Sequence, residues 1–167
     1  MAALVPFRLP ASPRPVGDPA PLPYLWSDDD QRVGGIDLTV EVFLLTPAMR
    51  AERQPPHRLS RANLRDLYWT VAQMVTHHTS NGCNLLPGDL LATGTVSGAV
   101  EGSAGCLLEL THGGTTPIRL PNGESRTALE DGDEVILRGF CRQAGRPQIS
   151  LGECRGVVLT ARASNEG

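Results

Sequence analysis

The sequence predicts a mainly β protein of the α+β class that also contains one long amphipathic helix. Two patterns in the chain support this prediction. From Ile36 to Leu44, apolar residues alternate with mostly polar ones, which is typical of a half-buried strand. After Gly82, short apolar runs are separated by Gly, Pro, Asn and Asp, which is typical of a series of hairpins.

The long helix is expected between Ser60 and Gly82. Ser60 is a suitable N-cap, and Asn81-Gly82 tolerate the left-handed conformation that closes a helix. Between these ends, residues recur at spacings of three and four, which is the stripe of an amphipathic helix. The stripe consists of Leu64, Leu67, Tyr68, Val71, Met74, Val75 and His78.

Strands are expected in the second half of the chain wherever an apolar run lies next to a tight turn. The turns are marked by Pro87-Gly88-Asp89, Gly113-Gly114, Asn122-Gly123 and Asp131-Gly132-Asp133. The expected strands are residues 90–93, 106–110, 117–120, 135–140 and 149–159.

The chain is expected to divide into three parts. Residues 1–20 are rich in proline, which favours extended backbone and indicates a linker or a strap. Residues 21–161 are expected to form one domain, and residues 162–167 a tail. Within the domain we expect an exposed loop at residues 46–59 and a solvated turn at the acidic run 28–30.

Composition narrows the possible partners. The 167 residues fit one domain, and 40% hydrophobic and 20% charged residues are typical of a globular protein. A net charge of -3 provides no basic field for nucleic acid, so we expect no nucleic-acid partner. No stretch of about 18 apolar residues is present, so we expect no membrane span and a cytoplasmic location.

General catalytic motifs are missing from the sequence. The chain has no Lys, so it cannot provide a Schiff-base nucleophile. Its serine in Gly94-Thr95-Val96-Ser97-Gly98 lies one place too late for a nucleophile elbow. The cysteines form no C-x-x-C pair and are expected to be reduced, partly buried thiols. They are Cys83, Cys106, Cys141 and Cys154.

A specific resemblance begins at residues 77–85, His-His-Thr-Ser-Asn-Gly-Cys-Asn-Leu, and continues through Pro-Gly-Asp-Leu-Leu-Ala at 87–92 and Gly-Thr-Val-Ser-Gly at 94–98. It extends through Leu-Glu-Leu at 108–110 and Asp-Gly-Asp-Glu-Val-Ile at 131–136. These segments resemble the C-terminal portion of the fumarylacetoacetase (fumarylacetoacetate hydrolase) family. The resemblance covers about residues 21–161 and is in register throughout.

The resemblance implies hydrolysis of a carbon–carbon bond in a β-diketone acid. The family cleaves 4-fumarylacetoacetate to fumarate and acetoacetate, the last step of tyrosine and phenylalanine breakdown. A divalent metal (Mg2+ and Ca2+ occur in the complete enzyme) polarises the diketone, and a histidine activates water. The family fold is a mixed β-sandwich roll preceded by a small N-terminal barrel. The partner expected for this chain is a second copy, giving a homodimer, or a missing N-terminal half.

Two residues match functional positions of the family. Glu109 matches a glutamate that orients and charges the catalytic histidine, and Thr95 matches a threonine that contacts substrate. We expect Glu109 to lie on an alternating strand, from which its carboxylate can face an imidazole. His77 and His78 do not match the catalytic histidine and are expected to pack at the end of the helix.

In the family, the catalytic histidine, the metal ligands and the other functional residues lie upstream of the segment that corresponds to Pro21 and the residues after it. Upstream of Pro21 this chain has no His and only Asp18 as an acidic residue, so the resemblance places no metal ligand on it. The chain is therefore expected to be inactive alone, as a truncated gene product or one half of a split enzyme. Two alternatives stay open: a non-catalytic assembly or binding module, and a related hydratase or isomerase of the family.

Overall fold

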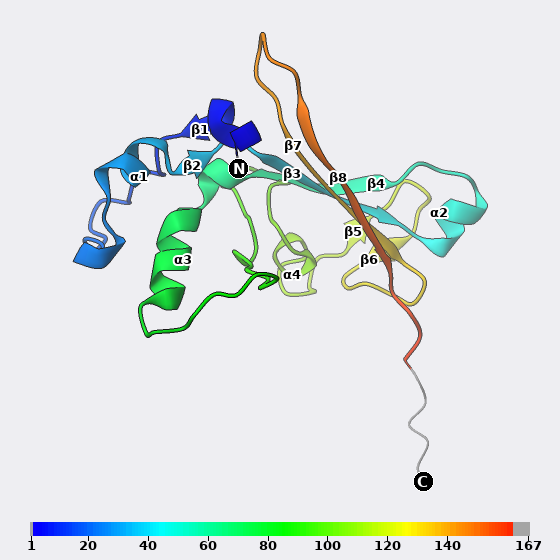
Figure 1. The fold of residues 1–167 in the computed structure, drawn as a ribbon. Coiled ribbons are helices and arrows are strands. Elements are labelled where there is room, and N and C mark those ends of the chain that lie inside the picture. The colour runs from blue at the N-terminus through cyan, green and yellow to red at the C-terminus, as the bar shows by residue number, and fades with distance from the viewer. Residues whose placement is uncertain (1, 162–167) are drawn as a thin grey trace.

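A four-stranded antiparallel sheet forms the centre of the fold, with strand order β4-β3-β7-β8 (Figure 1). The structure is a computed structural model and describes residues 2–161, so the predicted tail at 162–167 lies outside the described residues. The sheets and short helices confirm a mainly β protein of the α+β class. The four strands are β3 (Thr39–Leu45), β4 (His57–Asn63), β7 (Glu134–Cys141) and β8 (Ile149–Val157).

The alternating segment that begins at Ile36 forms two strands. Gly35–Ile36 is β2, and β3 follows after a two-residue break. β3 pairs with β4 on one side and β7 on the other, so its backbone hydrogen bonds are made within the sheet. Ile36, Leu38 and Leu44 are buried, as the alternation predicts.

The predicted helix start at Ser60 is wrong. Ser60 lies in β4, where its hydroxyl donates a 2.6 Å hydrogen bond to the carbonyl of Ala104. A 3-10 helix, η3 (Leu64–Asp66), follows, and only the nine-residue α3 (Val71–Thr79) occupies the second half of the predicted range. Residues 57–63 form backbone hydrogen bonds with β3. This pairing with a distant strand overrides the local helical pattern, so the segment is a strand.

Thr70 is the true N-cap of α3. Its hydroxyl accepts the amide of Gln73, whose side chain accepts the amide of Thr70 in return, and the same hydroxyl donates to Asp30 at 2.6 Å. This reciprocal arrangement is a capping box. His77 and His78 lie in the last turn of α3, where the helix was expected to end.

Replacing Thr70 with alanine is expected to lower the free energy of unfolding by about 1–2 kcal/mol, because the cap and its bond to Asp30 are lost together. Amide hydrogen exchange along α3 measures this effect. Ser60→Ala is the matched control: it removes a hydroxyl from β4 and should leave the exchange of α3 unchanged. Faster exchange of α3 in Ser60→Ala than in Thr70→Ala would contradict the assignment.

Three other segments differ from expectation. The acidic run starts a helix, α1 (Asp28–Val33), because Ser27 caps it and three carboxylates favour the positive end of a helix dipole. The expected loop at 46–59 contains a second capped helix, α2 (Pro47–Ala51), and the start of β4. Residues 80–106, all described, contain no helix or strand, so the strand expected at 90–93 is wrong.

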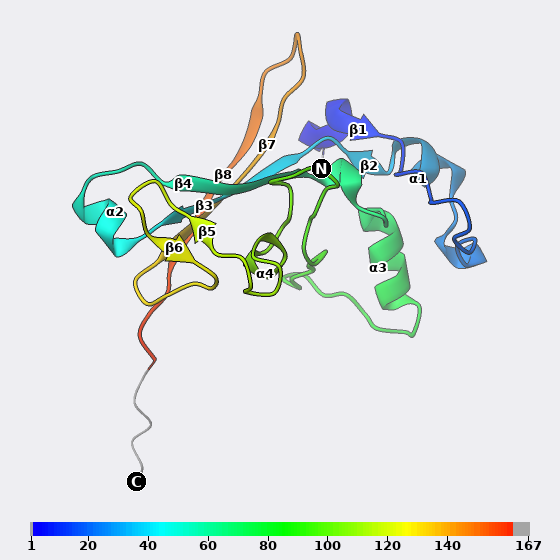
Figure 2. The ribbon, with the colours of Figure 1, turned by 180° about the vertical axis from the view of Figure 1, so that it is seen from behind.

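The later hairpins are confirmed. β5 (Ile118–Arg119) and β6 (Ser125–Arg126) pair across the Asn122-Gly123 turn, in which Gly123 has a φ of 88°. That left-handed conformation favours glycine over residues that have a Cβ. β7 and β8 pair as a long hairpin whose tip projects beyond the rest of the fold in both views (Figures 1 and 2).

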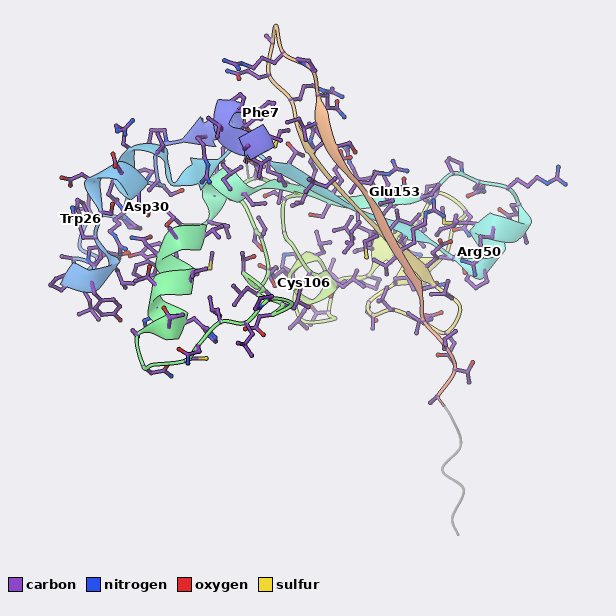
Figure 3. All side chains as sticks on the ribbon, viewed as in Figure 1. Phe7, Trp26, Asp30, Arg50, Cys106 and Glu153 are labelled. Atoms are coloured by element: carbon purple, nitrogen blue, oxygen red, sulfur yellow. The ribbon has the colours of Figure 1, made fainter. Side chains whose placement is uncertain are left out.

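The proline-rich N-terminal segment packs against the sheet. It contains the 3-10 helix η1 (Ala2–Phe7) and β1 (Arg8–Leu9), which pairs with β2. Phe7 is buried in a cluster with Ile36, Leu38 and Cys141. A further 3-10 helix, η2 (Pro23–Leu25), contacts α3, and Figure 3 shows Phe7 beside the sheet.

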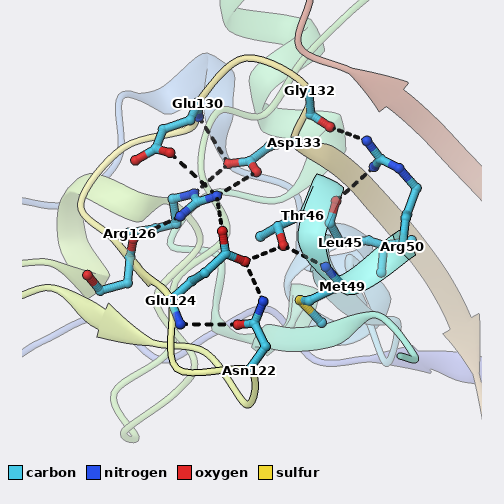
Figure 4. A network of polar contacts seen from close by, with 11 residues as sticks. Leu45, Thr46, Met49, Arg50, Asn122, Glu124, Arg126, Glu130, Gly132 and Asp133 are labelled. Atoms are coloured by element: carbon cyan, nitrogen blue, oxygen red, sulfur yellow. Dashed lines mark hydrogen bonds and ion pairs between the residues drawn. The ribbon is translucent and has the colours of Figure 1, made fainter. Parts of the chain in front are cut away.

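A second core lies where α2 meets the sheet and is bordered by buried charges. Leu44, Leu45, Met49 and Leu120 form this core. Beside it, the guanidinium of Arg126 donates to both carboxylate oxygens of Asp133 at 2.9 and 3.2 Å (Figure 4). These side chains are 5% and 0% exposed, and the neighbouring carboxylate raises the pKa of Arg126.

Glu124 extends this ion pair to α2. It accepts hydrogen bonds from Thr46, the N-cap of α2, and from Asn122, and it lies 3.3 Å from Arg126 (Figure 4). The hydrogen bond from Thr46, followed by that from Asn122, lowers the pKa of Glu124. The network therefore joins the β5–β6 hairpin, the turn before β7 and α2.

The chain leaves a large surface uncovered. Its accessible surface is 11275 Å². A compact monomer of 17.8 kDa is expected to expose about 8,000 Å². Large apolar side chains contribute to the surface, on the loop after α3 and on β7 and β8. They include Leu86, Leu90, Leu91, Leu137 and Leu151.

Candidate functional site

The candidate site lies where the loop before α4 (Leu107–Leu110) folds back on that helix. The loop passes beneath the sheet in both views, and Cys106, labelled in Figure 3, is the N-cap residue of α4. Glu109 lies within α4, so the prediction that it lies on a strand is wrong. The alternation of Leu108, Glu109 and Leu110 is too short to distinguish a strand from one helical turn, and here no neighbouring strand pairs with it.

Two side chains donate hydrogen bonds to the carboxylate of Glu109. The Ser97 hydroxyl is 2.9 Å from both carboxylate oxygens, and the Cys106 thiol donates to Oε2 at 3.1 Å. Hydrogen bonds from Cys106, and then from Ser97, lower the pKa of Glu109. The carboxylate is exposed, so it is both ionised at neutral pH and accessible to a further donor.

Thr95 is exposed and is positioned by the same fold of the loop. A Cβ atom built on Gly105 would be 2.5 Å from Thr95 Cγ2 and from the carbonyl oxygen of Val96. Gly105 is therefore required for the close approach between the two sides of the loop. The approach brings the segment that holds Thr95 against the segment that leads into Glu109.

His77 and His78 belong to a different neighbourhood. His77 Nδ1 is 2.9 Å from the Tyr24 hydroxyl, and the two rings stack with centroids 6.4 Å apart. His78 Nε2 is 3.6 Å from the Cys83 thiol. Among the described residues, the side chains that hydrogen-bond to Glu109 are Ser97 and Cys106, so none of the four histidines is its partner.

The residues present do not fit a divalent metal site. Within residues 2–161, no three His, Cys, Asp or Glu side chains are placed to hold a metal ion. Because Mg2+ and Ca2+ require several oxygen ligands, Glu109 with its two neutral donors is not such a site. In the same part of the chain, no helix has the length and apolar character needed to cross a membrane.

Sequence reasoning missed Ser97, Gly105 and Cys106 as parts of the site. The sequence marks Ser97 as part of the Gly-Thr-Val-Ser-Gly segment without a role of its own, and Cys106 as a partly buried thiol. One usable signal was the spacing of three between Cys106 and Glu109, which places both on one side of a helical turn. The contact between Ser97 and Glu109 depends on the path of the loop and has no such signal.

Comparison with known proteins identifies the family. The family model described as Fumarylacetoacetate (FAA) hydrolase C-terminal matches residues 30–159. The chain belongs to the fumarylacetoacetate hydrolase family. This confirms the resemblance to the C-terminal portion of fumarylacetoacetase.

Relatives that are named fumarylacetoacetase align with nearly the whole chain. The Homo sapiens protein is 45% identical over 161 residues, which is 96% of this chain and 36% of the relative. The Arabidopsis thaliana protein is 44% identical over 157 residues, or 94% of this chain and 34% of its own length. The chain thus spans about a third of the length of these fumarylacetoacetate hydrolase family members.

Proposed function

We propose that this chain provides one part of the active site of a fumarylacetoacetase-type hydrolase. The reaction is cleavage of the carbon–carbon bond of 4-fumarylacetoacetate to fumarate and acetoacetate, in tyrosine and phenylalanine catabolism. The observation that carries the proposal is the Glu109 carboxylate, which is held ionised by Ser97 and Cys106 and is open to solvent.

Glu109 is assigned the role of orienting a histidine supplied from outside the described residues. A carboxylate has about four lone-pair positions, and Ser97 and Cys106 leave some of them free. An imidazole N–H donated to a free position fixes the tautomer and stabilises the imidazolium that forms when the ring takes a proton from water. Thr95 is assigned to substrate contact, because its exposed side chain lies on the same folded loop.

Residues 21–161 are proposed as the family domain, with residues 1–20 preceding it. The roll is completed by the remaining part of the family sequence, which is called the complementary polypeptide whether it belongs to the same protein or to another. The catalytic histidine and the metal ligands are assigned to that polypeptide, since the described residues of this chain do not fit the metal. The four cysteines are free thiols, which supports a cytoplasmic location.

Turnover of 4-fumarylacetoacetate tests the proposal. The 167-residue chain alone is expected to produce no fumarate or acetoacetate above the uncatalysed rate. Mixing it with the part of the Homo sapiens relative that lies outside the aligned region is expected to give both products, measured by chromatography. Turnover by the chain alone would refute the assignment of the histidine to another polypeptide. If the mixture instead converts a substrate of a family hydratase or isomerase, the proposed hydrolysis is replaced by that reaction.

A second candidate function is that of an assembly module. The surface exceeds that of a compact monomer by about 3,000 Å², which is more than the roughly 1,000–2,500 Å² that each partner contributes to an obligate interface. β8 pairs with β7 only, so its outer edge is free among the described strands. The occupants proposed for this surface are a second copy of the chain and the complementary polypeptide. Sedimentation velocity distinguishes these occupants, and a sharp monomer that ignores the complementary polypeptide would count against both.

A further inference from the structure

We propose that Ser97 is a positioning residue that fixes the orientation of the Glu109 carboxylate, and that the backbone amide of Gly105 holds Ser97 in place. The inference rests on the role assigned to Glu109 under the proposed function. It adds two residues, one through its side chain and one through its backbone amide, to the two that the resemblance implies, Glu109 and Thr95.

The direction of the Ser97 hydroxyl follows from its hydrogen bonds. Its oxygen accepts the amide of Gly105 at 3.0 Å, so this side of the oxygen is occupied and the proton is available for Glu109. The oxygen is 2.9 Å from both Oε1 and Oε2 of Glu109. Equal distances place the hydroxyl between the two oxygens, a position that restricts rotation of the carboxylate.

The Cys106 thiol restricts the carboxylate further. It lies 3.1 Å from Oε2 and approaches from the N-terminal end of the same helical turn. The lone-pair positions of the carboxylate that point away from Ser97 and Cys106 are then free to accept a hydrogen bond from an imidazole. Because a hydrogen bond is strongly directional, a carboxylate with one fixed orientation aligns a histidine better than a freely rotating one.

Gly105 connects the two residues that match the family. Its amide reaches Ser97 only because the backbone at 105 lies against Val96 and Thr95, where a Cβ would be 2.5 Å from both. Its φ is not in the left-handed region, so this close approach is the reason for glycine. The backbone of Gly105 therefore positions Thr95 by direct contact, and it positions Glu109 through the hydrogen bond to Ser97.

The experiment measures the carboxylate of Glu109 by carbon-13 NMR in the 167-residue chain, as a function of pH. Ser97→Ala is expected to move the pKa of Glu109 upward, because a donor to the ionised form is lost. Cys106 is the titratable side chain bonded to Glu109, and it is unchanged in this variant. Gly105→Ala is expected to produce the same upward shift without altering either side chain.

Two variants separate positioning from loop stability. Ser97→Thr keeps the hydroxyl and should restore the wild-type titration. Ser103→Ala is the matched control: its hydroxyl lies in the same loop, is buried and donates to the carbonyl of Val100, so its loss should leave Glu109 unchanged. An unchanged titration in Ser97→Ala, or an equal shift in Ser103→Ala, would overturn the proposal.

Kinetics of the mixture with the complementary polypeptide provide the second readout. Ser97→Ala should lower kcat roughly 10-fold to 100-fold, the value of one hydrogen bond to a charged group, with KM little changed. A loss confined to KM would overturn the positioning role. Absence of turnover by the unaltered mixture would refute the proposed function instead, and the NMR titration would then decide the role of Ser97 by itself.

Discussion

Replacing Arg126 with methionine is expected to lower the free energy of unfolding by about 3–5 kcal/mol. The substitution leaves the carboxylate of Asp133, which is 0% exposed, without the guanidinium that donates to both of its oxygens. A buried charge without a partner is far more costly than an intact pair is stabilising. Urea denaturation followed by circular dichroism measures the change.

Two further variants test this explanation. Arg119→Met changes an exposed arginine on the neighbouring strand of the same hairpin and should stay within about 0.5 kcal/mol of the unaltered chain. The double variant Arg126→Met with Asp133→Leu removes both charges and should recover part of the lost stability. Equal stability of Arg126→Met and Arg119→Met would show that the ion pair does not hold the β5–β6 hairpin to the sheet.

Replacing Glu109 with glutamine is expected to lower kcat of the mixture about 10²-fold to 10⁴-fold, the range of a general-base contribution. Glutamine keeps the size of the side chain but loses the charge that supports an imidazolium. Association with the complementary polypeptide should be unchanged, and chromatography of fumarate measures the rate. Glu101→Gln, an exposed carboxylate on the same loop, is the matched control and should have no effect. Full activity of Glu109→Gln would remove Glu109 from the catalytic site.

The pH dependence of kcat gives a related expectation. Hydrogen bonds from Cys106 and Ser97 lower the pKa of Glu109, so the carboxylate stays ionised down to a pH below the ordinary range for glutamate. The histidine must be neutral to take a proton from water, so activity should fall first as the histidine is protonated and again, at lower pH, as Glu109 takes up a proton at its lowered pKa. In Ser97→Ala the step that belongs to Glu109 should move to higher pH. A step at the same pH in both proteins would assign it to another group.

Local patterns predicted the central strand and the late hairpins well. The alternation after Ile36 corresponds to burial in the sheet, and Asn122-Gly123 requires a turn whatever surrounds it. The helix that begins at Val71 was predicted to begin too early, because the pairing of residues 57–63 with β3 outweighs their local sequence pattern. Such pairing depends on residues far away in the sequence.

The sequence predicted some residues of the candidate site but not the contacts between them. Glu109 and Thr95 were found through the family resemblance, and the helix that carries Glu109 was mistaken for a strand. Ser97 contacts Glu109 across a loop of a dozen positions without regular structure, and no periodicity describes such a path. The close approach at Gly105 became evident only from the space around it.

The most direct test of the central claim is the carbon-13 signal of the Glu109 carboxylate while the complementary polypeptide is added to the labelled chain. If Glu109 faces a histidine of that polypeptide, its signal should shift in proportion to complex formation, together with that of Thr95, whereas Glu101 should not respond. Formation of the complex with no change at Glu109 would contradict the claim that this chain contributes the carboxylate of a shared hydrolytic site.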